Sequence, residues 1–164
     1  MFRNEFAKAT TLEELKSIYK KLAMKNHPDR GGSNEAMKEI NNLYEEFFSI
    51  LKNTHKNAAG ETYAKETAET ADWFMDIINE LLKMPGLVIE IIGCFIWVSG
   101  NTKANKDGLK KIGMRWSNNK GMWYKSAPGY KKRSKKQYSI DEIRNSFGVQ
   151  YRTSTADQEQ LAFA

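Results

Sequence analysis

Hydrophobic residues in the first third of the chain recur at the spacing of two amphipathic helices. The stripe from Leu12 to Lys25 follows Thr11, a favoured N-cap residue, and Glu14 completes the pattern of a capping box. A second stripe runs from about Asn34 to Leu51, with Ser33 as the expected cap. Because only a short segment separates the stripes, we expect the two helices to bury their apolar faces against each other as an antiparallel hairpin.

The segment between these stripes, residues 26–32, has the composition of a loop. Its sequence is Asn-His-Pro-Asp-Arg-Gly-Gly. Pro28 has no amide donor and the paired glycines favour open backbone, so neither helix is expected to continue through it.

The middle of the chain is predicted to be a polar linker followed by one further helix. Residues 53–62 are polar and lack periodicity, and His55 within them is expected to be exposed and without a role. From roughly Glu61 to Met84 an acidic start passes into an amphipathic pattern that stops before Pro85. The aromatic residues of this helix are more typical of a core than of a binding surface.

The rest of the chain changes to β-branched and aromatic residues, which predict a small sheet. Strands are expected at 88–92 and 95–98, a short helix at 106–112, and a hairpin over 114–124. Ser139 and Glu142 form a capping box for a last helix that ends near Gly148. The fold class is therefore α+β. We expect a helical hairpin at 1–52, a linker and amphipathic helix at 53–84, a β-β-α-β-β module with a final helix at 85–148, and a disordered tail at 149–164.

The composition indicates a globular protein and argues against disulfide-linked, secreted and membrane proteins. Hydrophobic residues make up 40% of the 164, enough for real cores, and the single cysteine, Cys94, excludes an internal disulfide. The longest apolar run, residues 87–98, is too short for a membrane helix, and the N-terminus lacks a secretory pattern. We therefore expect a cytoplasmic protein with no membrane association.

Charge is distributed unevenly along the chain. Residues 101–152 carry 14 basic and 3 acidic side chains, within a protein whose net charge is +6. Such a block favours anionic partners, nucleic acid first among them.

The first two helices and their loop carry a resemblance to a known family. Residues 19–32, Tyr-Lys-Lys-Leu-Ala-Met-Lys-Asn-His-Pro-Asp-Arg-Gly-Gly, followed by Ile-Asn-Asn-Leu-Tyr at 40–44, resemble the J-domain of DnaJ (Hsp40) co-chaperones over residues 8–52. The resemblance implies that the chain binds a DnaK-type Hsp70 and stimulates its ATP hydrolysis. Asp29 would accept charge-assisted hydrogen bonds from the partner, His27 would hold the loop and share in contact, and Pro28 would stiffen it.

Lysines of the first predicted helix fit the same interpretation. Lys16, Lys20, Lys21 and Lys25 are expected to project away from the apolar stripe as a cationic ridge that steers an acidic partner surface. The alternatives are that these lysines are an ordinary solvated face and that His27 only satisfies a turn. The chain also departs from the family pattern. There is little room before Thr11 for the usual first helix, and no basic fourth helix, glycine/phenylalanine-rich segment or cysteine-rich zinc module follows.

Residues 95–102, 109–117 and 123–124, with tryptophans on either side of a short helix, resemble a small module of phage-type proteins. Compact J-proteins of phages and mobile elements are similar in size. Aromatic and basic residues alternate there, and they would suit a stacking platform for single-stranded nucleic acid. Equally, the tryptophans would form the core of the small sheet. The candidate partner-binding residues are Lys110, Lys111, Arg115, Trp116, Trp123, Lys131, Lys132, Arg133, Lys135 and Lys136. The last five form a loop that would contact phosphates or serve only as a linker.

Three hypotheses follow. The leading one is a co-chaperone whose C-terminal module directs Hsp70 to a client or nucleoprotein complex, in a bacterial or phage-infected cell. The second is a nucleic-acid-binding protein in which the hairpin is structural, and the third is a phage inhibitor of host machinery. No phosphate-binding loop, metal-ligand spacing or nucleophile motif is present, so we expect neither an enzyme nor a cofactor or metal.

Overall fold

The computed structural model describes residues 1–57, 59–92, 94–130, 132, 136–147 and 151–154. Residues 146–147 and 151–154 are described by their backbone alone. The chain forms two compact units. One combines Met1–Lys56 with Gly60–Lys83, and the other combines Asn57–Ala59 with Met84–Ala164. The units are described separately below.

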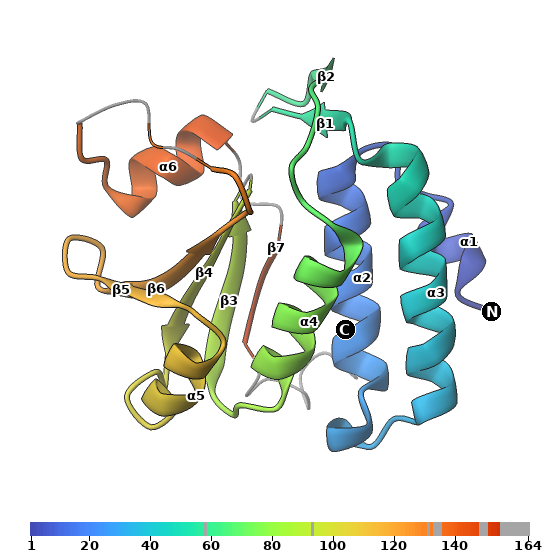
Figure 1. The fold of residues 1–164 in the computed structure, drawn as a ribbon, viewed down its shortest axis with the longest axis horizontal. Coiled ribbons are helices and arrows are strands. Elements are labelled where there is room, and N and C mark those ends of the chain that lie inside the picture. The colour runs from blue at the N-terminus through green and yellow to red at the C-terminus, as the bar shows by residue number, and fades with distance from the viewer. Residues whose placement is uncertain (58, 93, 131, 133–135, 148–150, 155–164) are drawn as a thin grey trace. The chain divides into compact units, whose positions relative to one another are not determined.

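Helices dominate the N-terminal unit. They are α1 (Arg3–Phe6), α2 (Leu12–Asn26), the single 3-10 turn η1 (Pro28–Arg30), α3 (Asn34–Leu51) and α4 (Ala71–Leu82). Figure 1 shows α2 and α3 side by side and antiparallel, with η1 joining their lower ends, so the predicted hairpin is confirmed.

The two long helices begin at their expected caps. Thr11 Oγ1 accepts a hydrogen bond from the backbone N–H of Glu14, and Ser33 Oγ accepts one from that of Ala36. The Glu14 carboxylate reaches back to the backbone N–H of Thr10, one residue earlier than a standard capping box requires.

Aromatic rings from three helices form the centre of this unit. The ring centroids of Tyr19 on α2 and Tyr44 on α3 lie 4.6 Å apart, and Phe74 of α4 lies 5.9 Å from Tyr19 and 5.7 Å from Tyr44. All three side chains are fully buried, as are Leu15 and Ile40 beside them. The core interpretation of the aromatic residues in the third predicted helix is therefore confirmed for Phe74. The structure groups α4 with the hairpin, where we expected a separate connecting segment.

Three expectations about the N-terminal unit are wrong. A first helix does fit before Thr11, because the single turn α1 needs only four residues to bury Phe6. The helix expected from Glu61 begins only at Ala71, since residues 57–69 have no apolar stripe and Thr70 provides the cap, accepting from Trp73 N–H.

The third correction concerns the expected linker. Its strand β1 (Thr54–Lys56) pairs with β2 (Thr62–Ala64) as an antiparallel hairpin. His55 is not exposed and idle, because its side chain is only 12% exposed and its Nδ1 lies 2.9 Å from Glu13 Oε1.

The C-terminal unit contains one antiparallel sheet of five strands in the order β5-β6-β4-β3-β7. Its elements are β3 (Leu87–Ile92), β4 (Phe95–Gly100), α5 (Lys106–Lys111), β5 (Arg115–Ser117), β6 (Met122–Ser126), α6 (Ile140–Phe147) and β7 (Tyr151–Ser154). The predicted β-β-α-β-β order is confirmed.

Part of the expected disordered tail is ordered in this sheet. Tyr151–Ser154 pairs with β3, in a register that sets Thr153 opposite Ile89. The edge of β3 offers unpaired backbone groups to any extended segment that reaches it. Pairing of this kind leaves no hydrophobic stripe in the sequence, so the strand was not predicted. Residues 149–150 and 155–164 of that tail lie outside the described residues.

One face of the sheet is organised around α6. Ser139 and Glu142 form the predicted reciprocal capping box at its start. Buried Glu90 of β3 accepts hydrogen bonds from Arg144 of α6 at 2.8 and 2.9 Å. Trp97 is 4% exposed and lies in a buried cluster with Ile92 and Met122. The interpretation that the tryptophans form the core of the small sheet is therefore confirmed for Trp97.

Candidate functional site

The loop between α2 and α3 is held in one conformation by His27. The backbone of this residue leaves the helix with φ −65° and ψ 136°, and its Nδ1 accepts a hydrogen bond from Asp29 N–H at 3.2 Å. Its carbonyl accepts two more, from Arg30 N–H and Gly32 N–H, each at 2.9 Å. At position 32 a Cβ would collide with the backbone of Asn26, so only glycine allows the chain to turn this closely. His27 thus caps η1 from both its side chain and its backbone.

The three residues of the turn differ in accessibility. The His27 side chain is buried, with 6% of the residue exposed, whereas Pro28 and Asp29 are exposed and the Asp29 side chain is 54% accessible. The expected exposed turn is therefore present for positions 28 and 29. The buried His27 side chain supports the loop through its hydrogen bond from Asp29 N–H.

Burial also sets the charge of His27. It lowers the pKa of the imidazole below its ordinary value of 6.5, and the nearby ammonium of Lys83 acts in the same direction, while the carboxylate of Asp29 opposes them. The imidazole is therefore neutral at physiological pH. A neutral ring can leave Nδ1 unprotonated, which is the form that accepts the hydrogen bond from Asp29 N–H.

The loop is connected to α4 by Arg30. Its Nε donates a hydrogen bond to the carbonyl oxygen of Leu82 at 3.2 Å, at the C-terminal end of α4. A cation at this end is favoured, because the last carbonyls of a helix lack intrahelical donors. The sequence gives no sign of this contact, which joins residues 52 positions apart.

The predicted cationic ridge is only half present. Lys21 and Lys25 are exposed on α2, close to the loop. Lys16 and Lys20 are 2% and 0% exposed, so placing them on an open ridge was wrong. For Lys16 the physical reason is that Glu69 and two aromatic rings of α4 lie on this side of α2.

Lys16 is enclosed by acidic and aromatic groups. Its Nζ makes an ion pair with Glu69, and both side chains are 3% exposed. The same ammonium lies 5.3 Å from the ring centroid of Phe74 and 5.9 Å from that of Trp73. Glu69 is a residue that the sequence analysis missed, because no local pattern connects it to Lys16.

The candidate residues of the C-terminal unit are mostly accessible. Lys110 and Lys111 on α5 and Arg115 on β5 are exposed, and Trp116 is 46% exposed with its Nε1 donating to Asn118 Oδ1. Trp123 is 7% exposed and packs edge to face against Trp116, so it belongs to the core.

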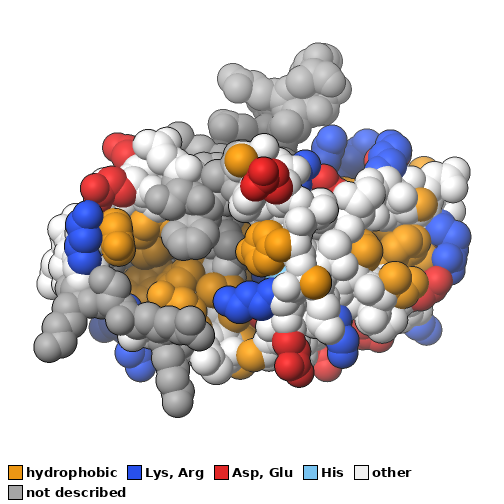
Figure 2. All heavy atoms as spheres, turned by 90° about the horizontal axis from the view of Figure 1, so that it is seen from above, with side chains coloured by type: hydrophobic (Ala, Val, Ile, Leu, Met, Phe, Trp, Pro, Cys, Tyr) orange, Lys and Arg blue, Asp and Glu red, His pale blue; other side chains and the backbone are white. Residues whose placement is uncertain are grey.

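The predicted basic loop can be placed only in part. Lys132 and Lys136 are exposed, while Lys131, Arg133 and Lys135 lie outside the described residues. On the face drawn in Figure 2, the basic side chains that the structure describes stand at the edge of an open hydrophobic area over the C-terminal unit.

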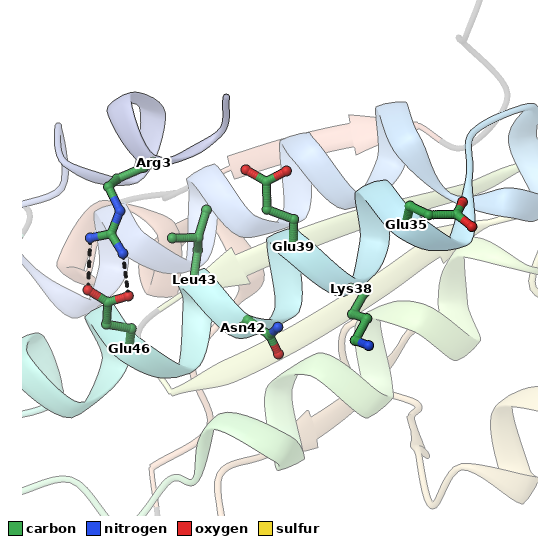
Figure 3. A pocket seen from close by; sticks show the side chains of 7 residues that line it. All are labelled: Arg3, Glu35, Lys38, Glu39, Asn42, Leu43 and Glu46. Carbon is green, nitrogen blue, oxygen red and sulfur yellow. Dashed lines mark hydrogen bonds and ion pairs between the residues drawn. The ribbon is translucent and has the colours of Figure 1, made fainter.

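A shallow pocket runs along α3. Figure 3 shows Arg3 extending from α1 to Glu46, where its two terminal nitrogens donate to the carboxylate at 2.8 and 2.7 Å. The other lining residues are Glu35, Lys38, Glu39, Asn42 and Leu43, all on α3. Within the described ranges, no group of three or more His, Cys, Asp or Glu side chains could hold a metal ion. The helices that the structure describes include none long and apolar enough to cross a membrane.

Comparison with known proteins finds relatives of the N-terminal region. The chain is 42% identical to DnaJ protein homolog 2 of Allium porrum over 60 residues, which are 37% of this chain and 13% of the relative. It is 42% identical to the chaperone protein DnaJ of Mycoplasmopsis pulmonis over 64 residues, 37% of this chain and 16% of the relative. The small t antigen of budgerigar fledgling disease virus is 51% identical over 37 residues, 23% of this chain and 26% of the relative.

These matches cover only about the first 60 residues, and the chain spans between 13% and 26% of the length of these relatives. No protein-family model and no solved structure matches the chain. The shared region contains the helical hairpin and the His-Pro-Asp turn described above. The N-terminal region of this chain is therefore a J-domain, the part that it has in common with DnaJ chaperones and T antigens.

Proposed function

We propose that this protein is a co-chaperone that binds a DnaK-type Hsp70 and stimulates its ATP hydrolysis. The observation that carries the proposal is the His27-supported turn, which presents the side chain of Asp29, 54% accessible, at the tip of a packed helical hairpin. An exposed carboxylate on a rigid turn can accept charge-assisted hydrogen bonds without losing loop entropy on binding.

The chemistry of this site suits docking and not catalysis. The turn contains no nucleophile beside a base, and Lys21 and Lys25 next to it offer positive charge to an acidic surface. In this proposal the hydrolytic residues belong to Hsp70, and the J-domain favours the conformation of Hsp70 that hydrolyses ATP. The effect is therefore a coupling between two sites on the partner.

Substitution of Asp29 tests the proposal without disturbing the fold, because the side chain is exposed. We expect Asp29→Asn to raise the concentration of protein that gives half-maximal stimulation of the host Hsp70 by about 10- to 100-fold, the loss of one charge-assisted hydrogen bond of about 1.5–3 kcal/mol. Asp107→Asn, on exposed α5, is the matched control and should behave as the unchanged protein. Equal stimulation by both variants would refute the role of the turn.

The C-terminal unit is proposed to direct the chaperone to a client or a nucleoprotein complex. The specific observation is the run of exposed Lys110, Lys111, Arg115 and Trp116, in which a half-exposed indole follows three cations. Stacking of a base on the indole, together with phosphate contacts to the cations, would bind single strands with little sequence preference.

Fluorescence titration with single-stranded oligonucleotides tests this second role. We expect quenching of tryptophan emission, an affinity that falls steeply with salt, and a salt slope that decreases by about one for each lysine changed to glutamine. Trp116→Ala should weaken binding by about 1–3 kcal/mol. If the oligonucleotides do not bind at low salt, the nucleic-acid role is excluded and the proposed target is a protein client.

A further inference from the structure

The two faces of the C-terminal sheet carry different tryptophans. Side chains that are cross-strand partners lie on the same face, and neighbours along a strand lie on opposite faces. Trp97 is the cross-strand partner of Tyr124. Trp116 is the partner of Trp123, the neighbour of Tyr124, and therefore lies on the opposite face. The face that carries Trp97, on which α6 also packs, is called the Trp97 face below.

Aromatic rings form a stripe on the Trp97 face. The ring centroids of Phe95 and Trp97 lie 5.7 Å apart with an angle of 18° between their planes, and the ring of Tyr124 lies 5.3 Å from that of Trp97. Tyr130 packs edge-on against Phe95 at 4.7 Å and is 46% exposed. Phe95 and Tyr124 are half-buried. The stripe therefore leads from the core at Trp97 to solvent at Tyr130.

The indole N–H of Trp97 has no hydrogen-bond acceptor among the described residues, although only 4% of the residue is exposed. A buried donor without an acceptor costs free energy, and native proteins contain few of them. The indole of Trp116, by contrast, donates to Asn118. An acceptor supplied by a ligand would remove this cost at Trp97.

Positive charge lies beside the same indole. The Nζ of Lys120, in the turn between β5 and β6, is 5.5 Å from the ring centroid of Trp97. Burial lowers the pKa of Lys120, and the nearby ammonium of Lys132 lowers it further. Glu90, the cross-strand partner of Trp97, already accepts from Arg144 at 2.8 Å, so its charge is neutralised. The combination of two neighbouring ammonium groups favours an anion at the edge of the stripe.

A nucleotide supplies what this face can bind. Its base is a flat ring that stacks on aromatic side chains, and most bases carry a carbonyl oxygen in the plane of the ring that can accept from an N–H. Its phosphate pairs with ammonium groups. An acidic peptide also carries negative charge, but none of its side chains combines a stacking ring with a carbonyl acceptor in the plane of that ring.

We propose that the Trp97 face is a binding site for a nucleotide. The base stacks on Tyr130 and the aromatic stripe, and the Nε1 of Trp97 donates to a carbonyl oxygen of the base. The side chain of Lys120 is flexible, so its ammonium can leave the indole and bind the phosphate together with Lys132. The site goes beyond the nucleic-acid role proposed for Trp116, because it uses other residues on the other face. A free nucleotide and a nucleotide within a single strand share this chemistry.

The indole N–H signals of the isotope-labelled, unchanged chain test the site by nuclear magnetic resonance. Each tryptophan gives one such signal, which single Trp→Phe variants assign. We expect a short oligothymidylate to move the Trp97 signal downfield and to slow its exchange with water, because the N–H gains an acceptor. An abasic strand of the same length, which has phosphates but no bases, should leave this signal unchanged. Thymidine monophosphate is the probe for a free nucleotide.

Substitution of Lys120 gives a second measurement. We expect Lys120→Gln to weaken binding of the oligothymidylate about tenfold at low salt, the loss of one charge-assisted contact, and to reduce the salt slope by about one. Lys103→Gln removes the same charge from an exposed position between β4 and α5 and should leave the affinity unchanged. Both variants are made with Trp116→Ala, so that stacking on that indole does not contribute.

The outcomes separate this site from the proposed function. A shift of the Trp97 signal by the strand alone supports a nucleotide within a strand, and a shift by the monophosphate as well supports a free nucleotide. If the strand binds and moves the Trp116 signal, while the Trp97 signal and the affinity of Lys120→Gln stay unchanged, this site is overturned and the role of Trp116 stands. If neither probe binds, both are overturned. A shift of the Trp97 signal by an acidic, phenylalanine-containing peptide in place of the nucleotides would overturn the nucleotide site in favour of a protein ligand.

Discussion

The buried ion pair between Lys16 and Glu69 predicts an unusually large coupling in a double-mutant cycle. Both side chains are 3% exposed, so each charge is removed from water and depends on the other. Lys16→Met leaves a buried carboxylate and Glu69→Leu leaves a buried ammonium, and each should cost about 3–5 kcal/mol of unfolding free energy. The double variant replaces the pair by apolar groups of similar length and should fall within about 1–2 kcal/mol of the unchanged protein.

Urea unfolding followed by helical circular dichroism measures this cycle. The helices lie mainly in the N-terminal unit, so the signal reports on the unit that contains the pair. An exposed pair would contribute only about 0–1 kcal/mol. Single variants that each lose less than 1 kcal/mol, or a double variant that loses the sum of both, would refute the placement of Glu69 against α2.

Three further predictions address the loop, the aromatic core and the sheet. Burial lowers the pKa of His27. The stability that its neutral form provides is therefore complete above pH 6.5 and is lost as pH falls through the lower folded-state pKa. Stimulation of Hsp70, measured from about pH 8 to 5, should fall only on the acid side. Tyr19→Phe removes a buried hydroxyl that accepts from Asn79, and should cost about 1–2 kcal/mol in urea unfolding; an unchanged midpoint would contradict the contact. Glu90→Gln replaces the buried carboxylate that accepts from Arg144, and should lower the thermal midpoint of the C-terminal unit, read by tryptophan fluorescence, while Hsp70 stimulation persists. Loss of stimulation would contradict the assignment of this activity to the N-terminal unit.

Local patterns predicted most of the elements in this chain. The stripe and cap at Thr11 and the stripe after Ser33 place α2 and α3 almost to the residue, because capping and helical periodicity act over three or four positions. The His-Pro-Asp turn is largely local, since proline, glycine and the hydrogen bonds of His27 to its neighbours set its backbone. The core of the candidate site was therefore predictable from residues 11–51 alone.

What the sequence could not predict depends on contacts between distant segments. Lys16 and Lys20 have the pattern of a solvated helix face, yet both are buried, and Lys16 is enclosed by Glu69 and by the aromatic rings of α4, more than fifty residues later. The strand at 151–154 likewise depends on an edge of β3 that no periodicity reveals. In both cases a pattern analysis assigns the residues to solvent, because polar residues at a tertiary contact look the same as polar residues on a surface.

In the proposed function, the turn that His27 supports switches on an Hsp70 ATPase. The most direct test is single-turnover ATP hydrolysis by the host Hsp70, with the unchanged protein and with His27→Gln compared at equal concentration, and circular dichroism to establish that both are folded. The account predicts that the unchanged protein accelerates hydrolysis, and that His27→Gln, which removes the ring that caps the loop, loses at least about 90% of this acceleration. Equal acceleration by the two folded proteins would contradict the account.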